Sequence, residues 1–199
     1  QRLFSLSCGI FALLKKIDKY GTDNIIEDLN FIRSTIDDVM KELRNRIYGL
    51  SWKKSGCNSF VNDIKSYIDE TKRLNNVSIP FSIIGNDELL SCEQKKSIYR
   101  MVCEGIANAV HHGQAKNIEV SLSIEPERCI LSIVDDGIGF DVDKVKADDT
   151  VGIGIKNLEQ LSELQGGKTI VKSNPGMGTW IEITIPTNGV LEKGEEVSI

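Results

Sequence analysis

The sequence predicts an α+β protein, in which an α/β sandwich with helices on one face of its sheet follows an antiparallel helical hairpin. The first fifty residues carry apolar side chains at alternating steps of three and four, the spacing of a coiled-coil seam. After a polar break near residues 49–58, helical spacing alternates with short runs of period two, which are typical of half-buried strands. These two patterns predict two domains and a tail, over residues 1–54, 55–190 and 191–199.

Two apolar stripes define the hairpin. The first helix carries Leu3, Leu6, Ile10, Leu13 and Ile17, and the second carries Ile25, Leu29, Ile32, Ile36, Val39 and Leu43. Gly21 ends the first helix, and Asp23 or Asn24 caps the second. Because a lone hairpin leaves both stripes exposed to water, we expect residues 1–50 to form a homodimeric four-helix bundle. The alternative is a hairpin that packs on the second domain of the same chain.

The second domain alternates helices and strands in the order typical of a sandwich. Helical spacing marks residues 59–74, 92–113 and 154–167. Strand patterns mark residues 77–85, 117–126, 127–136, 168–174 and 179–186, and the last two form a hairpin. We therefore expect a largely antiparallel sheet with the helices on one face.

Composition and charge exclude several classes of protein. The 199 residues include 24 Lys and Arg against 29 Asp and Glu, and the net charge of −5 disfavours direct binding to nucleic acid. No run of about 18 apolar residues is present, so we expect no membrane contact within this chain and a cytoplasmic location, with any membrane anchor of the full-length protein upstream. Five cysteines without a CxxC pair argue against zinc and indicate reduced thiols.

Three glycine-bearing segments point to ligand binding: DDGIGF at residues 135–140, VGIGI at 151–155 and NPGMGTW at 174–180. The first places a carboxylate at a strand end, before glycines that let backbone approach a ligand. The second opens a helix whose unpaired amides suit phosphate. The third brings backbone close again and offers the hydroxyl of Thr179. Each segment alone is typical of a turn. Their occurrence in this order, after a helix with polar residues, is a much more specific indication of ligand binding.

That helix, residues 92–113, carries a polar stripe. Glu104, Asn108 and His112 are four apart, so each is displaced by about 40° around the axis from the last, and His111 lies on the flank of the stripe. The Asn108 carbonyl is a hard oxygen ligand suited to Mg²⁺, which binds through few protein ligands and substrate phosphates. Adjacent histidines point about 100° apart and have no third soft ligand nearby, which disfavours a zinc site.

Together these segments resemble an ATPase superfamily shared by histidine kinases, type II topoisomerases and mismatch-repair ATPases. EGIANAVHHG (104–113) resembles its N box, DDGIGF its G1 box, VGIGI its G2 box, and PGMGTWIEITIP its closing strand pair. The heptad hairpin resembles the dimerisation domain of sensor histidine kinases that work with NarL/LuxR-type response regulators. The resemblance covers residues 1–186 and implies the histidine-kinase-type ATPase fold.

The resemblance implies a site for ATP and Mg²⁺. Asn108 would hold the Mg²⁺ that bridges the phosphates, and Glu104 would orient or polarise groups near the transfer site. Asp135 would accept a hydrogen bond from the adenine amino group. Gly137 and Gly139 would shape the wall of the adenine pocket, and Thr179 would support that pocket. The remaining implied contacts are Gly152, Gly154 and His111 at the phosphates and His112 at the ribose or base. Residues 141–151 would form a short mobile lid.

Two departures from the family pattern bear on function. The family often has Lys-His where this chain has His111-His112, which replaces a permanent cation with a titratable one. The family phosphoacceptor lies in an HDxxxQ motif whose glutamine would match Gln1, so the acceptor histidine would lie upstream. The chain alone is then not expected to phosphorylate itself, and Gln1 is a candidate for dephosphorylating a partner regulator.

The prediction is therefore the cytoplasmic catalytic core of a two-component sensor histidine kinase. It would bind Mg-ATP and transfer the γ-phosphoryl group to a histidine upstream of Gln1, and then to a response regulator. Two alternatives stay open. An anti-sigma-factor-type serine kinase has an N box that can also end in HG, although it lacks the hairpin. A non-catalytic nucleotide-binding regulator would signal through the bundle, and the intact Glu104, Asn108 and Asp135 disfavour it.

Overall fold

The computed structural model describes residues 59–147 and 153–187, together with Leu29. The predicted hairpin and its dimer, Gln1, Gly152 and the tail lie outside the described residues, so these predictions stay predictions. The chain divides into two compact units, Gln1–Gly56 and Cys57–Ile199. Every helix and strand discussed below belongs to the second unit.

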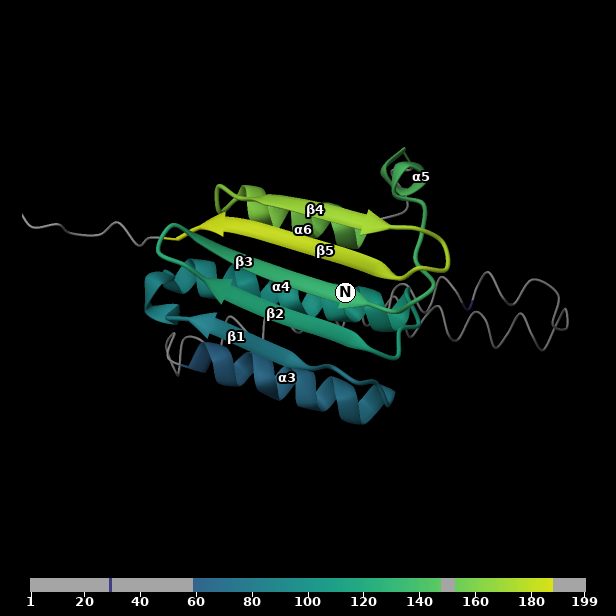
Figure 1. Cartoon of the computed structure of the whole chain (residues 1–199), viewed down its shortest axis with the longest axis horizontal. Helices are drawn as coiled ribbons and strands as arrows, with labels where there is room; N and C mark the ends of the chain where they lie inside the picture. The colour runs from purple at the N-terminus through teal and green to yellow at the C-terminus, as the bar shows by residue number, and fades with distance from the viewer. Residues whose placement is uncertain (1–28, 30–58, 148–152, 188–199) are drawn as a thin grey trace, which may run out of the picture. The chain divides into compact units, whose positions relative to one another are not determined.

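Within the described residues, five strands form one mixed sheet in the order β1-β2-β3-β5-β4 (Figure 1). They are β1 Phe81–Gly85, β2 Ile118–Ile124, β3 Arg128–Asp135, β4 Lys168–Ser173 and β5 Thr179–Pro186. β1 runs parallel to β2 and all other neighbours are antiparallel, which confirms the largely antiparallel sheet. β1 is shorter than the expected run of residues 77–85, because Pro80 has no amide hydrogen to donate.

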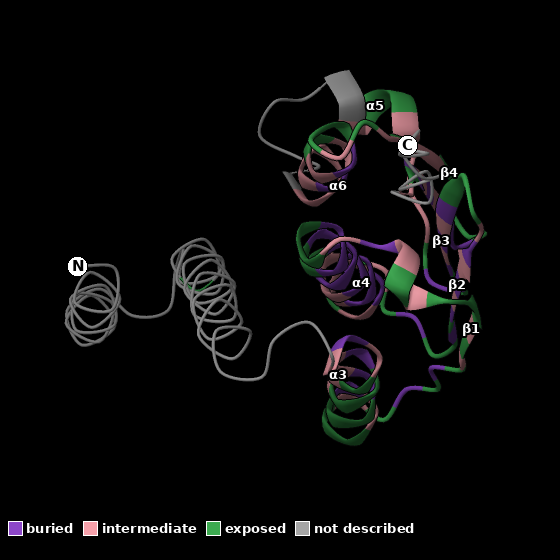
Figure 2. Ribbon diagram, turned by 90° about the vertical axis from the view of Figure 1, so that its left-hand side faces the viewer, coloured by how far each residue is buried: buried purple, intermediate pink, exposed green. Residues whose placement is uncertain are grey.

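The helices of the described region cover one face of this sheet, as expected (Figure 2). They are α3 Phe60–Asn75, α4 Cys92–His111 and α6 Ile153–Glu163, with the short α5 Val142–Ala147 and the 3-10 helix η2 Asp87–Leu89 in connections. α5 occupies much of the segment expected to be a lid, so this segment is partly helical. Residues 148–152 lie outside the described ranges.

The central helix α4 is delimited by its own sequence. At its start, Ser91 and Gln94 form a capping box: the Gln94 amide donates to Ser91 Oγ at 3.1 Å and the Ser91 amide donates to Gln94 Oε1 at 2.9 Å. The helix ends at His111, two residues earlier than expected. The amides of His112 and Gly113 both donate to the carbonyl of Asn108, at 3.0 and 2.9 Å, and thus close its last turn.

Strand alternation places the core between the sheet and α4. Inner-face side chains of the central strands are almost fully buried, namely Ile118, Val120, Leu122, Leu131, Ile133, Ile181 and Ile183. α4 meets them with Ile98, Met101, Val102 and Ile106. Each such side chain stabilises the fold by about 1.5–3 kcal/mol relative to an exposed one. At one end of this apolar face, however, the sequence places Asp135 and Thr179.

The structure also bears on membrane-spanning helices and on the state of the cysteines. No helix within residues 59–147 or 153–187 has the length and apolar character needed to cross a membrane. Cys103 and Cys129 are free thiols, and burial raises the pKa of Cys129 to about 12, so this thiol stays protonated. The expectation of reduced thiols is wrong for Cys92, which is disulfide-bonded.

Candidate nucleotide-binding site

The sheet pairs Asp135, the last residue of β3, with Thr179, the first residue of β5. Alternation along each strand puts both side chains on the helix-covered face, in line with Ile133 and Ile181. Each residue is only 9% exposed. A buried carboxylate costs free energy and contributes little to packing, so its presence here indicates a functional group.

Burial raises the pKa of Asp135 above its ordinary value, and hydrogen bonds to the charged form act against this effect. The Gly137 amide donates to Asp135 Oδ1 at 2.8 Å, and the amide and hydroxyl of Thr179 also stabilise the carboxylate. The negative charge of Asp136 then adds to the upward shift. An ionised carboxylate has about four acceptor positions, so capacity remains for a donor on a ligand, such as an amino group.

The turn between β4 and β5 packs directly on this strand end. Gly178 has a φ of +70°, and a Cβ added to it would collide with the carbonyl oxygen of Asp135. Ser173 Oγ donates to the Gly178 carbonyl at 2.8 Å and accepts from the Phe140 amide at 2.9 Å. Ser173 therefore ties the turn to the end of the DDGIGF segment, a contact that no sequence pattern indicated.

Replacing Gly178 with alanine is expected to lower the free energy of unfolding by about 3 kcal/mol, from the left-handed backbone and the displaced neighbour together. Gly176 is the matched control, since its φ is +80° but an added Cβ would meet nothing within 4 Å among the described residues. Alanine at Gly176 therefore costs only the backbone part, about 1–2 kcal/mol. Urea denaturation measures both losses, and equal losses would contradict the close contact with Asp135.

α4 supplies the polar stripe that the sequence predicted. Glu104 and Asn108 are half-buried, while Ile106 and Ala109 on the same helix are buried in the core. His111 and His112 lie exposed at the C-terminal end of the helix. The stripe therefore flanks the core and does not form part of its packing.

Gly154, in the first turn of α6, lies against this stripe. A Cβ added to Gly154 would be 2.7 Å from both terminal atoms of the Asn108 side chain and 2.8 Å from Glu104 Oε1. A larger residue fits only if these side chains move. The fold thus brings the VGIGI and EGIANAVHHG motifs together, although they are about forty residues apart in the sequence.

Asp135 and Asn108 lie in the same region of the fold. α4 lies on β3 so closely that a Cβ on Gly105 would collide with Ile133 Cδ1. Just beyond the helix, the carbonyl of Gly113 accepts from the Ile138 amide at 2.8 Å. The C-terminal end of α4, the end of β3 and the start of β5 lie at the same end of the sheet (Figure 1).

The donor set fits a metal that keeps few protein ligands. Among residues 59–147 and 153–187, no three His, Cys, Asp or Glu side chains cluster as a metal cage would require. Asn108 with Glu104 beside Gly154 is instead a sparse oxygen set next to a helix N-terminus. This suits Mg²⁺, which takes one or two protein oxygens together with phosphate oxygens.

The fold and the arrangement of these residues are similar to those of ATPase domains of the histidine kinase type. Residues 93–189 match the family model described as "Histidine kinase-, DNA gyrase B-, and HSP90-like ATPase". Among solved structures, the histidine kinase AdeS of Acinetobacter baumannii has a TM-score of 0.57 and 13% identity, with coverage of 94% of this chain and 96% of that chain. At this identity the similarity concerns the fold.

The chain is similar over most of its length to curated sensor kinases of Bacillus subtilis (strain 168). Sensor histidine kinase LiaS is 26% identical over 195 residues, which cover 98% of this chain and 52% of LiaS. Signal transduction histidine-protein kinase/phosphatase DegS is 29% identical over 126 residues, which cover 62% of this chain and 33% of DegS. The chain thus spans about half of LiaS and a third of DegS.

Proposed function

We propose that this chain is the catalytic part of a two-component sensor histidine kinase, which binds Mg-ATP and donates its γ-phosphoryl group. The observation that carries the proposal is the contact of Gly154 with both Asn108 and Glu104, at the end of the sheet where Asp135 pairs with Thr179. The part of the site around Asp135 offers a buried acceptor for an adenine amino group. The part around Asn108 offers an oxygen ligand, a carboxylate and helix amides for the metal and the phosphates.

In this proposal Asn108 holds Mg²⁺ and Glu104 orients the groups that react. Bound Mg²⁺ would neutralise charge on the phosphates and hold the γ-phosphoryl group in line for transfer. The protein contributes mainly by positioning, since phosphoryl transfer needs little covalent chemistry from it. The remaining nucleotide contacts are assigned to Gly137, Gly139 and Thr179 around the base, Gly152 and Gly154 at the phosphates, His111 at phosphate and His112 at the ribose or base.

The proposal extends to partners of the whole protein. The phosphoryl group would pass to a histidine of the longer protein and then to a response regulator of the NarL/LuxR type, in the cytoplasm. Residues 1–50 would form the homodimer. DegS is named as both a kinase and a phosphatase, and Gln1 is the candidate for phosphatase activity in this chain.

The proposed function predicts Mg²⁺-dependent binding that selects ATP. Isothermal titration should show at least about tenfold weaker binding of GTP, because guanine presents an acceptor where adenine presents its amino group to Asp135. Chelating Mg²⁺ with EDTA should weaken ATP binding. In a longer protein that includes the upstream segment, radiolabel from γ-labelled ATP should appear on a histidine, whereas the present chain alone should stay unlabelled.

Asn108→Ala is the informative variant, and Asn75→Ala on α3 is its control. Asn75 Nδ2 donates to a carbonyl of its own helix, that of Thr71 at 3.1 Å. Asn108→Ala should remove the Mg²⁺ dependence and the label, while Asn75→Ala keeps both. ATP binding without labelling of the longer protein would favour a non-catalytic regulator, and label on His111 or His112 would contradict the proposed acceptor.

A further inference from the structure

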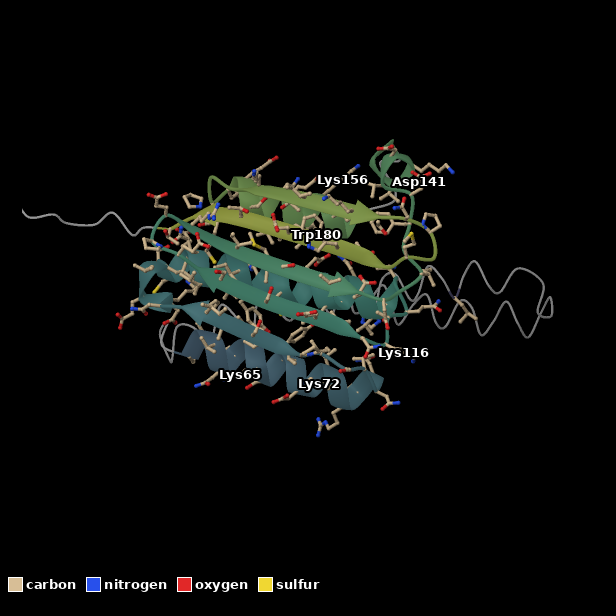
Figure 3. All side chains as sticks on the ribbon, in the orientation of Figure 1. Lys65, Lys72, Lys116, Asp141, Lys156 and Trp180 are labelled. Carbon is tan, nitrogen blue, oxygen red and sulfur yellow. The ribbon has the colours of Figure 1, made fainter. Side chains whose placement is uncertain are left out.

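Asp136, the second acidic residue of DDGIGF, has a set of contacts unlike those of its neighbour Asp135. Its carboxylate is exposed, yet it accepts three hydrogen bonds from the segment that precedes β2. Oδ1 accepts from the amides of Lys116 and Asn117 at 2.8 and 2.9 Å. Oδ2 accepts from the side-chain amide of Asn117 at 2.7 Å. Figure 3 labels Lys116 at the start of β2.

These bonds join the two segments that carry the two ends of the site. Residues 112–117 connect α4, with Asn108, to β2, and residues 136–140 follow Asp135 directly. Backbone bonds add to the connection, since Asp136 donates to the Asn117 carbonyl at 3.2 Å and Ile138 donates to the Gly113 carbonyl at 2.8 Å.

Hydrogen bonds also connect residues 112–117 to α4. The amide of Gly113 donates to the Asn108 carbonyl at 2.9 Å. The backbone of Asn108, to which the proposed function assigns the metal, is therefore hydrogen-bonded to the segment that contacts Asp136. On the other side, Asp136 is covalently next to Asp135. A movement of the 112–117 segment would therefore change the separation between Asn108 and Asp135.

We propose that Asp136 is a positioning residue that sets the spacing between the base-binding and the phosphate-binding ends of the site. The proposal rests on the proposed function, because the two ends are defined by the nucleotide. A ligand that spans both ends binds well only at the correct spacing, whereas a ligand that touches one end does not sense it. Misplacement by about an ångström can cost a large factor in such a site.

A merely structural role would give a different result. The Asp136 carboxylate is exposed, so water can accept hydrogen bonds from Lys116 and Asn117 once the carboxylate is removed. Little core packing depends on this side chain. We therefore expect Asp136→Ala to leave the melting temperature nearly unchanged. The substitution should instead change the relative affinities of the protein for two ligands of different length.

The test compares Mg-ADP with adenosine by isothermal titration, with all variants measured at pH 8. Asp136→Ala should weaken Mg-ADP about tenfold and leave adenosine within about twofold. Asp136→Asn should restore most of the Mg-ADP affinity. Its carbonyl still accepts from the Lys116 and Asn117 amides, and Asn117 can turn its own oxygen toward the new amino group.

Glu125→Ala is the matched control, since Glu125 is an exposed carboxylate that accepts from Arg128 Nε at 2.8 Å, at the opposite end of β2. It should change neither affinity. Equal losses for Mg-ADP and adenosine in Asp136→Ala, no loss for either, or no rescue by Asp136→Asn would each overturn the proposal. Wild-type protein that binds neither ligand would overturn the proposed function first, and this proposal with it.

Discussion

Replacing Asp135 with asparagine is expected to weaken Mg-ATP binding by about 10- to 100-fold, the cost of about 1.5–3 kcal/mol for a lost hydrogen bond to a charged group. Asp135 already accepts from Gly137 and Thr179, and adenine would add a further donor. A carboxylate only accepts, whereas an asparagine side chain has one oxygen and one amino group. Whichever way the amide turns, its amino group faces a donor.

The matched control for this substitution is Asp69→Asn, because Asp69 is an exposed carboxylate on α3 outside the site. It should leave the affinity for ATP unchanged in the same titration. If Asp135→Asn bound ATP as tightly as the wild-type protein, the adenine contact would have to be assigned to another residue.

The pH dependence of the same pair of proteins gives a second readout of Asp135. Because burial raises its pKa, Asp135 loses its charge at a higher pH than an exposed aspartate, and ATP affinity should fall as the pH drops through that value. Stability should change in the opposite sense. The folded state binds the proton more tightly than the unfolded state, so stability falls as pH rises from the ordinary value to the raised one. Asp135→Asn should lose both trends.

Gly154→Ala is expected to weaken Mg-ATP binding and phosphoryl transfer at least about tenfold with little change in melting temperature. The added Cβ would collide with the side-chain ends of Asn108 and Glu104. These ends can rotate away, and alanine favours a helix over glycine by about 0.8–1 kcal/mol, so the fold tolerates the change. The displaced Asn108, however, would no longer hold the metal that the proposed function assigns to it.

Titration of Gly154→Ala with and without Mg²⁺ separates these effects, because only the Mg²⁺-dependent part of the affinity should be lost. Glu163→Ala, at the other end of α6, changes the same helix away from the site and serves as the control. A Gly154→Ala variant that keeps its Mg²⁺ dependence would show that Asn108 does not hold the metal. A large drop in melting temperature would show that the collision is relieved by moving α6.

Much of the domain could be predicted because its signals are local. Helical spacing marks residues 92–113, period-two alternation marks the segments of β2, β3 and β5, and each of these elements is found in the structure. The element ends were less accurate: α4 stops at His111 where Gly113 was expected, since both amides that follow bond back to Asn108. β1 begins only after Pro80.

Contacts between distant segments could not be predicted in the same way. The sequence marked Asp135 as the chemical residue of DDGIGF and gave no role to Asp136, because its partners, Lys116 and Asn117, lie twenty residues earlier. Ser173 was likewise missed. Its bonds to Phe140 and Gly178 exist only once the G1 segment and the β4–β5 turn pack together.

The sequence alone determined which residues are chemically suited to a nucleotide: the stripe of Glu104 and Asn108, the carboxylate of Asp135, and glycines where backbone must come close. These choices depend on residue type and short spacing, which the chain carries in itself. Only the tertiary structure decided that Gly154 lies against Asn108 and that Thr179 lies opposite Asp135. Strand order and the packing of helices on a sheet set those distances, and both result from burying one apolar face across the whole domain.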